Sequence, residues 1–189
     1  MEYVTKKVTE FREVVEVYNS CMKRDFARNE LRPLVSIRLS WKRNAYDVYF
    51  MTDGDMVLGY ACFVRNGEDL LLDYLAIEKE HRDQGLGSVF LKQLTTCLTG
   101  SDLLVCEVEN PESAVNENDR ALRERRLQFY LRNGFNKTEV TSTVFGVDYC
   151  ILAMQDDKAH PTEEVREIYS ELGRSIVPLC FYKTQFKVY

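Results

Sequence analysis

Residues 72–77, with the sequence LDYLAI, and residues 82–88, with the sequence RDQGLGS, form the stretch that decides the fold. The first run is apolar and typical of a buried strand. After the second run, apolar residues recur at helical spacing on one face: Leu86, Val89, Phe90, Leu94, Cys97 and Leu98. We therefore predict a strand, a short loop and an amphipathic helix that opens on two glycines.

The two glycines and Arg82 indicate a binding site for a diphosphate. The first turn of a helix has backbone N–H groups without intrahelical acceptors, and the helix dipole places partial positive charge there. Gly85 and Gly87 carry no side chain that would keep a phosphate away, and Arg82 adds a forked set of donors. A P-loop would need a lysine where Ser88 stands, and a dinucleotide-binding loop would need a glycine where Phe90 stands.

The segments around this stretch predict one α+β domain with a C-terminal helical extension. Strands joined by the turn signals Asp53-Gly54-Asp55 and Asn66-Gly67 are expected at residues 46–52, 56–65 and 69–77. Helical patterns precede them, near residues 11–22 and 31–39. Further strands are expected at residues 103–108, 135–140 and 148–154, with a helix ending at residues 133–134 and another from 161 to 176.

Composition excludes several classes of protein. The chain has 189 residues, 45% of them hydrophobic, and a net charge of −5, which suits a globular domain and argues against a broad nucleic-acid-binding surface. Six cysteines without a C-x-x-C pair, and two histidines outside metal-ligand spacing, predict reduced thiols and no metal. The charged N-terminus and the lack of a long apolar run predict a cytoplasmic protein without a membrane partner.

Four motifs resemble those of the GNAT N-acetyltransferase superfamily, in the family's order. Residues 82–87 match its Arg/Gln-x-x-Gly-x-Gly/Ala signature, and Leu75-Ala76-Ile77 precedes it. Cys106-Glu107-Val108 follows as a strand, and residues 130–135 resemble the family's Tyr-x-x-x-Gly-Phe. The resemblance covers about residues 1–155. It implies a GNAT-like α+β fold (α/β in some schemes), with a mixed, mostly antiparallel twisted sheet and helices on both faces. The corresponding domains are residues 1–156 and an extension, 157–189, packed on the same domain or on a partner subunit.

The resemblance also implies acetyl-CoA as co-substrate and assigns its contacts. The backbone of the strand end would bind the pantetheine arm, through Leu75, Ala76 and Ile77. The pyrophosphate would meet Arg82 and the amides of Gln84, Gly85, Leu86, Gly87 and Ser88. The family's fourth and fifth strands splay apart around the thioester, and its tyrosine, matched by Tyr130, points at the coenzyme sulfur.

Acetyl transfer to an amine requires two proton movements. A lysine-like amine, with a pKa of about 10.4, must lose a proton before it attacks the thioester. Glu107 is the expected general base, directly or through water, and Asp73 on the neighbouring strand is the alternative. Tyr130 is the expected general acid for the departing thiolate. The plainer interpretations are a solvated strand position for Glu107, a packed aromatic for Tyr130 and a buried strand residue for Cys106.

The acceptor amine stays open between a small molecule and a protein or peptide. A charged insertion at residues 110–126 departs from the family pattern and predicts either a lid over the acceptor site or a solvated helix face with pairs such as Asp119–Arg123. Asp73, Glu107 and Glu109 would suit a cationic amine.

Two other functions remain open from the sequence. The first alternative is an acyl-CoA sensor without transfer activity. The second is an assembly module. The second idea rests on the apolar stripe of the last helix and the aromatic tail, which offer a surface for a homodimer or for self-packing: Val165, Ile168, Tyr169, Leu172, Ile176, Phe181, Tyr182 and Phe186.

Overall fold

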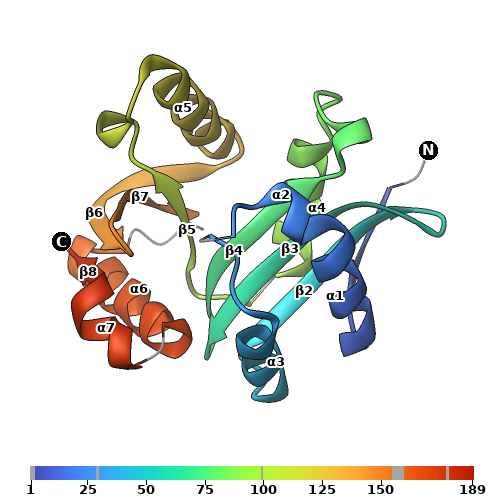
Figure 1. Cartoon of the computed structure of the whole chain (residues 1–189), viewed down its shortest axis with the longest axis horizontal. Helices are drawn as coiled ribbons and strands as arrows, with labels where there is room; N and C mark the ends of the chain where they lie inside the picture. The colour runs from blue at the N-terminus through green and yellow to red at the C-terminus, as the bar shows by residue number, and fades with distance from the viewer. Residues whose placement is uncertain (1–2, 29, 99, 155–159, 178) are drawn as a thin grey trace. The chain divides into compact units, whose positions relative to one another are not determined.

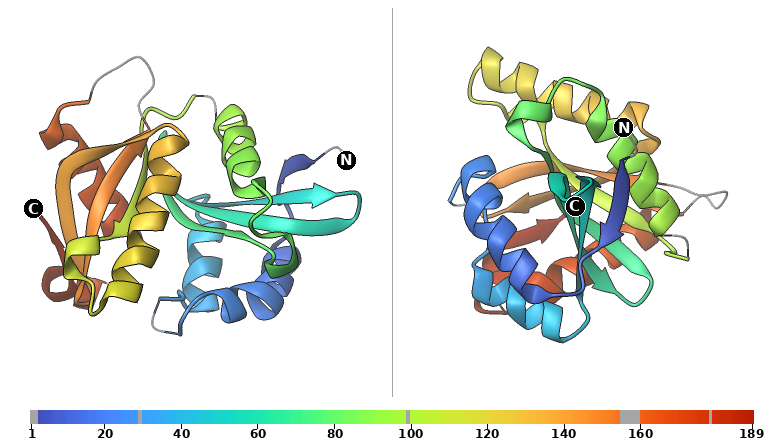
Figure 2. Two further views of the ribbon diagram at one scale, coloured as in Figure 1. Left: turned by 90° about the horizontal axis from the view of Figure 1, so that it is seen from above. Right: turned by 90° about the vertical axis from the view of Figure 1, so that its right-hand side faces the viewer.

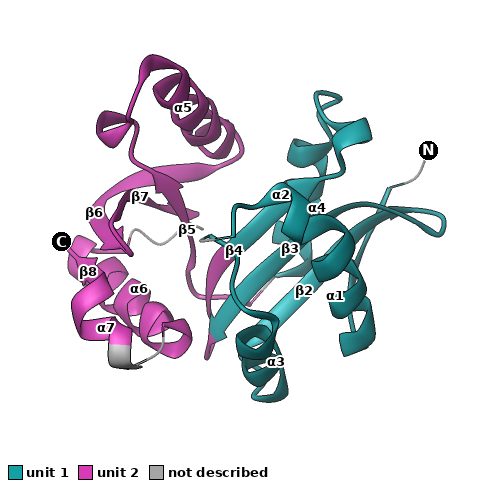
Figure 3. Ribbon diagram, viewed as in Figure 1, with its two compact units in different colours: residues 1–65, 73–99 teal, residues 66–72, 100–189 magenta. Residues whose placement is uncertain are grey.

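The computed structural model describes residues 3–28, 30–98, 100–154, 160–177 and 179–189. The chain divides into two compact units (Figure 3). Unit 1 comprises residues 1–65 and 73–99, and unit 2 comprises residues 66–72 and 100–189. Strand β4 (Asp69–Ile77) passes from unit 2 into unit 1.

Unit 1 contains the predicted meander. Its strands are β1 (Val4–Lys7), β2 (Tyr46–Asp53), β3 (Met56–Asn66) and the second part of β4, in the order β1-β2-β3-β4. The pairs β1–β2 and β2–β3 are antiparallel, and the turn signal at residues 53–55 predicts the second of them. The sequence did not predict β1, because this edge strand is short, mostly exposed and carries two lysines.

Helices cover both faces of the sheet in unit 1. On one face lie α1 (Phe11–Val17), its π-helical continuation η1 (Tyr18–Met22), α2 (Lys23–Asp25) and α3 (Leu34–Lys42), as Figures 1 and 2 show. On the other face lies α4 (Leu86–Cys97). This arrangement confirms the predicted helices in this unit.

The buried face of α4 differs in part from the predicted one. Leu86, Phe90 and Leu94 are buried as expected, and so is Leu91. Val89 is 40% exposed and Cys97 is exposed. Val89 lies about 120° around the helix from the centre of the buried stripe, and Cys97 is the last helical residue.

Unit 2 continues the sheet with one parallel pair. Its order is β4-β5-β7-β6-β8, with β5 (Leu104–Glu109), β7 (Val147–Met154), β6 (Phe135–Val144) and β8 (Phe186–Val188). Only the β4–β5 ladder is parallel among the pairs recorded for the described residues, and it joins Leu70–Leu72 to Leu104–Cys106. The mixed, mostly antiparallel α+β architecture is therefore confirmed.

Two helices lie on opposite faces of the strands of unit 2, α5 (Glu117–Arg132) and α6 (Thr162–Ile176), and α7 (Leu179–Gln185) leads into β8 (Figure 2). The predicted stripe of α6 is buried at four positions within this unit: Val165, Tyr169, Leu172 and Ile176. The C-terminal segment thus packs on β6, and Phe186 is buried with it. Phe181 is 48% exposed, and the homodimer stays a prediction.

Within the described ranges, none of the helices combines the length and the apolar character that crossing a membrane requires.

Gly59 on β3 allows a close approach of the neighbouring strand end. A Cβ atom at this position would lie 2.8 Å from the carbonyl oxygen of Ala76 and 2.7 Å from Cδ1 of Ile77.

We predict that Gly59→Ala lowers the free energy of unfolding by about 1–3 kcal/mol, because the backbone of β4 must move. Denaturant unfolding measures this change. Met56→Ala, at an exposed position of the same strand, is the control, and equal stability of both variants would contradict the prediction.

Candidate functional site

The loop before α4 adopts an uncommon backbone conformation. After η2 (Lys79–His81), Asp83 has φ of 61° and Gly85 has φ of 78°, both in the left-handed region. Gly85 is the N-cap of α4, and no side chain caps the helix there. A Cβ atom on Gly85 would meet nothing within 4 Å, so the space beside it is open.

Four consecutive backbone N–H groups of this loop have no hydrogen-bond acceptor in the described part of the chain. Among the residues that the structure describes, the N–H groups of Gln84, Gly85, Leu86 and Gly87 have no hydrogen-bond partner. The amide of Ser88, also predicted to bind pyrophosphate, already donates to the carbonyl of Gly85 at 3.1 Å. Four unpaired donors at a helix N-terminus fit an anionic ligand with several oxygens, such as a diphosphate.

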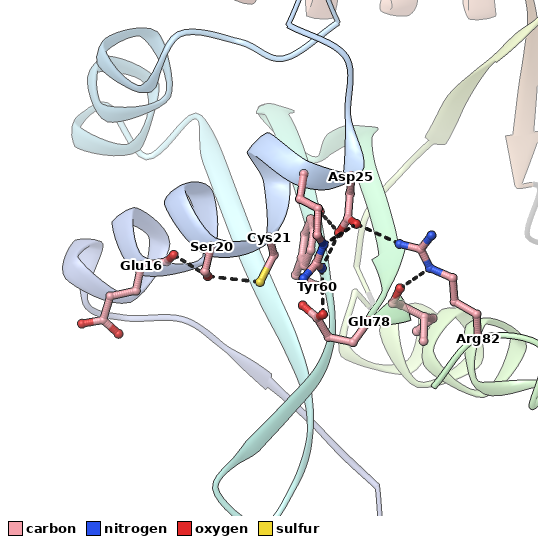
Figure 4. A network of polar contacts seen from close by, with 9 residues as sticks. Glu16, Ser20, Cys21, Asp25, Tyr60, Glu78 and Arg82 are labelled. Carbon is pink, nitrogen blue, oxygen red and sulfur yellow. Dashed lines mark hydrogen bonds and ion pairs between the residues drawn. The ribbon is translucent and has the colours of Figure 1, made fainter. Parts of the chain in front are cut away.

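Arg82 connects the loop to the rest of unit 1. Its Nε donates to the carbonyl oxygen of Ile77 at 2.8 Å, and its Nη2 donates to Asp25 Oδ1 at 2.9 Å (Figure 4). Its side chain remains 45% exposed. A contact of Arg82 with a phosphate stays a prediction, while its contact with Asp25 was not expected from the sequence.

The strand end that precedes the loop is only partly buried. Leu75, Ala76 and Ile77 are all of intermediate exposure. The parallel ladder of β4 with β5 covers Leu70–Leu72 and not these three residues. One edge of the strand end is therefore outside that ladder, as the predicted contact with a pantetheine arm requires.

Asp73 is engaged in a buried network. Both carboxylate oxygens accept from Arg32 Nε, at 3.0 and 2.9 Å, and Oδ2 also accepts from the hydroxyl of Tyr46 at 2.8 Å. Burial opposes the charge on Arg32, but Asp73 outweighs it and raises the pKa of the guanidinium. Burial, and then Asp73, raise the pKa of Tyr46. These contacts favour a structural role for Asp73 over that of a base.

Glu107 on β5 accepts a hydrogen bond from Tyr169 of α6. The hydroxyl of Tyr169 also lies 2.8 Å from that of Ser142 on β6, so the three groups form a chain. Burial, followed by the charge of Glu107, raises the pKa of Tyr169 well above its usual value, and the phenol therefore stays a donor. A donor on a carboxylate favours its ionised form. Tyr169 was counted only as part of an apolar stripe in the sequence, and nothing local to it signals this contact.

Tyr130 lies near the end of α5, between Phe129 and Phe135, with ring centroids 5.1 and 5.4 Å away. Its hydroxyl has no hydrogen-bond partner among the described residues. Burial raises the pKa of Tyr130, with a smaller contribution from Cys106, so the phenol keeps its proton at neutral pH.

The two proposed proton-transfer groups lie on opposite faces of β5. Successive side chains of a strand point to opposite faces, so Cys106 and Glu107 diverge. Glu107 contacts α6, whereas Cys106 is close enough to Tyr130 of α5 to affect its pKa. Burial also raises the pKa of Cys106 itself well above its usual value, which argues against a nucleophilic thiolate.

The charged insertion is largely paired within itself and with β5. Arg123 is buried and binds Asp119 at 3.0 Å, the predicted helical pair, and it also donates to the carbonyl of Asn110. Arg126 binds Glu109 at 2.6 Å. Asp73 and Glu109 are therefore each paired with an arginine.

The described cysteines are free thiols. Cys180 lies outside the residues whose side chains are described. Among the described side chains, no cluster of three or more histidines, cysteines and carboxylates could hold a metal ion.

The mixed sheet and this loop define an α+β domain in which α4 begins with amides that have no acceptor among the described residues. Residues 44–137 match the family model described as an acetyltransferase (GNAT) domain. The chain therefore carries a GNAT acetyltransferase domain over these residues.

Solved structures share this fold. A protein from Bacteroides thetaiotaomicron described as a GNAT-family acetyltransferase is 21% identical, with a TM-score of 0.72, over 90% of this chain and 96% of its own. A GNAT family acetyltransferase from Elizabethkingia anophelis with acetyl-CoA bound is 16% identical, with a TM-score of 0.54, over 82% and 98%. A Bacillus subtilis acetyltransferase in complex with CoA is 12% identical, with a TM-score of 0.56, over 82% and 99%. No curated protein sequence matches the chain.

The buried network around Asp73 predicts that loss of this carboxylate lowers the stability of the protein. Asp73→Asn removes the carboxylate charge that pairs with Arg32, and we expect the free energy of unfolding to fall by about 3 kcal/mol. Denaturant unfolding measures this, with Asp55→Asn in an exposed turn as the control. An Asp73→Asn variant of unchanged stability that lost turnover would instead identify Asp73 as the base.

Proposed function

We propose that this chain is an acetyl-CoA-dependent N-acetyltransferase that moves an acetyl group onto a primary amine. The observation that carries the proposal is the set of four consecutive amides, Gln84 to Gly87, without acceptors at the start of α4. The family match supports it, and so do the neighbours from Bacillus subtilis and Elizabethkingia anophelis, whose structures hold CoA and acetyl-CoA.

In unit 1, the proposed cofactor contacts follow from the backbone. The amides of Gln84–Gly87 would donate to the diphosphate oxygens, where the dipole of α4 adds to the attraction. The open edge of Leu75, Ala76 and Ile77 would hydrogen-bond the amides of the pantetheine arm. When bound, acetyl-CoA supplies the activated acetyl group.

In unit 2, the proposed proton transfers involve Glu107 and Tyr130. Glu107, which accepts a hydrogen bond from Tyr169, accepts a proton from the ammonium form of the acceptor, directly or through water. The neutral amine attacks the thioester carbonyl, the carbon–nitrogen bond forms as the carbon–sulfur bond breaks, and the nitrogen releases its second proton to solvent. Tyr130 donates its proton to the leaving thiolate and later regains one from solvent. No covalent intermediate on the protein is required.

Because Gly85 lies at the start of α4, a negative charge at this position should weaken the binding of acetyl-CoA. Asn and Asp both tolerate the left-handed backbone and can both cap a helix, so Gly85→Asn and Gly85→Asp differ mainly in one charge. We expect Gly85→Asp to bind acetyl-CoA about tenfold more weakly than Gly85→Asn, because the carboxylate repels the diphosphate. Calorimetry gives the two values of Kd.

The matched control is the same pair of substitutions at Gly54, a turn glycine with φ of 58° and open space beside it. Its two variants should bind acetyl-CoA equally well. Equal affinities of the two Gly85 variants would remove the support for a diphosphate at this loop.

The proposed acid and base predict the loss of turnover in two variants. Glu107→Gln and Tyr130→Phe should each lower kcat by about 100-fold, because each removes a proton-transfer group. The assay follows thiol release from acetyl-CoA with polyamines, aminoglycosides, amino acids and peptides as acceptors. Glu109→Gln, on the same strand but paired with Arg126, is the control and should retain kcat.

Two outcomes would speak against this proposal. Unchanged kcat in both variants would exclude the assigned roles. Binding of acetyl-CoA without thiol release for any acceptor would favour the alternative function, an acyl-CoA sensor.

A further inference from the structure

The carboxylate of Asp25, the last residue of α2, is almost completely buried, with its side chain 5% exposed. It accepts hydrogen bonds from Nη2 of Arg82 at 2.9 Å and from the hydroxyl of Tyr60 at 3.0 Å. Arg24 donates to it as well, with Nε 3.2 Å from Oδ1. Figure 4 shows Tyr60 and Arg82 converging on Asp25.

The partners of Asp25 come from separate parts of unit 1. Tyr60 lies on β3, Arg82 is in the loop before α4, and Arg24 is on α2 itself. Arg24 also binds Oε2 of Glu78, the residue after β4, at 2.7 Å. Asp25 therefore connects the loop to a helix and to a central strand, and Arg24 extends the connection to the end of β4.

Because Asp25 is buried, its carboxylate requires these contacts. A carboxylate removed from water is destabilised unless charges and donors compensate it, and Arg82 and Arg24 supply the charges. Burial, and then Asp25, raise the pKa of Tyr60, so its phenol stays protonated and can donate. Arg82 is held at a second point by the carbonyl of Ile77, which fixes the direction of its side chain.

We propose that Asp25 is a positioning residue for coenzyme A binding. By fixing Arg82, it holds the loop in the conformation that presents the amides of Gln84–Gly87 to the diphosphate. Asp25 acts through Arg82 and does not touch the ligand. This inference rests on the proposed function. A preordered loop binds more tightly, because less conformational entropy is lost on binding.

The first test compares two buried carboxylates of unit 1. Asp47 also pairs with cations, Lys7 Nζ at 2.6 Å and Arg65 Nη2 at 2.7 Å, and its side chain is 8% exposed. Asp25→Asn and Asp47→Asn should both lower the melting temperature. Only Asp25→Asn should raise the Kd and the KM for acetyl-CoA, by about tenfold, with kcat changed less than about twofold.

A double-mutant cycle tests whether Asp25 acts through Arg82. Arg82→Gln should also raise the Kd, and Asp25→Asn in that background should raise it no further. Multiplicative effects of the two substitutions would contradict the inference. If Asp25→Asn does not fold, Tyr60→Phe removes one hydrogen bond and no charge, and an unchanged Kd in that variant would count against the inference.

The outcomes separate the inference from the proposed function. An Asp25→Asn variant with the Kd of Asp47→Asn overturns the inference alone. So does tighter binding by Asp25→Asn, which would mean that Arg82, once released, binds the diphosphate directly. A wild-type protein without affinity for acetyl-CoA would overturn the proposed function, and this inference with it.

Discussion

The proposed binding of coenzyme A depends on the unpaired N–H groups at the start of α4. The first N–H groups of a helix have no intrahelical acceptor, and a serine, threonine, asparagine or aspartate usually caps them. Here glycine occupies the N-cap and no side chain caps the helix, so Gln84 to Gly87 keep their donors available. The glycine that permits the left-handed turn thus also leaves space for a ligand.

Such a loop needs support from outside itself, because it makes few hydrogen bonds of its own. Arg82 supplies one link, to the end of β4 and to Asp25. Gly59 supplies another, since only a glycine lets β3 approach the carbonyl of Ala76 so closely. In unit 2, the chain of hydroxyls from Ser142 through Tyr169 orients Glu107 in a comparable way. Arg82 and Glu107 are therefore each held by a partner that is distant in sequence.

Local patterns predicted much of the fold and the position of the loop before α4. Turn dipeptides and alternating apolar residues predicted β2, β3 and β4, and glycine spacing predicted the loop, because these signals act between near neighbours in sequence. The partners of the site residues were not predictable in this way. Arg82 and Asp25 are 57 residues apart, and Tyr169 and Glu107 are 62 apart. Such pairs are created by tertiary packing, and a tyrosine in an apolar stripe gives no sign of its hydrogen-bond acceptor. The short strands β1 and β8 were missed because three or four residues carry too little pattern.

Amide chemical shifts of the ¹⁵N-labelled protein, followed while ADP is added as the diphosphate-bearing fragment of coenzyme A, test the central claim most directly. The account predicts that the largest saturable shifts fall on Gln84, Gly85, Leu86 and Gly87, and that adenosine, which lacks the diphosphate, does not cause them. Shifts of equal size with adenosine, or saturable shifts that leave these four amides unchanged, would contradict it.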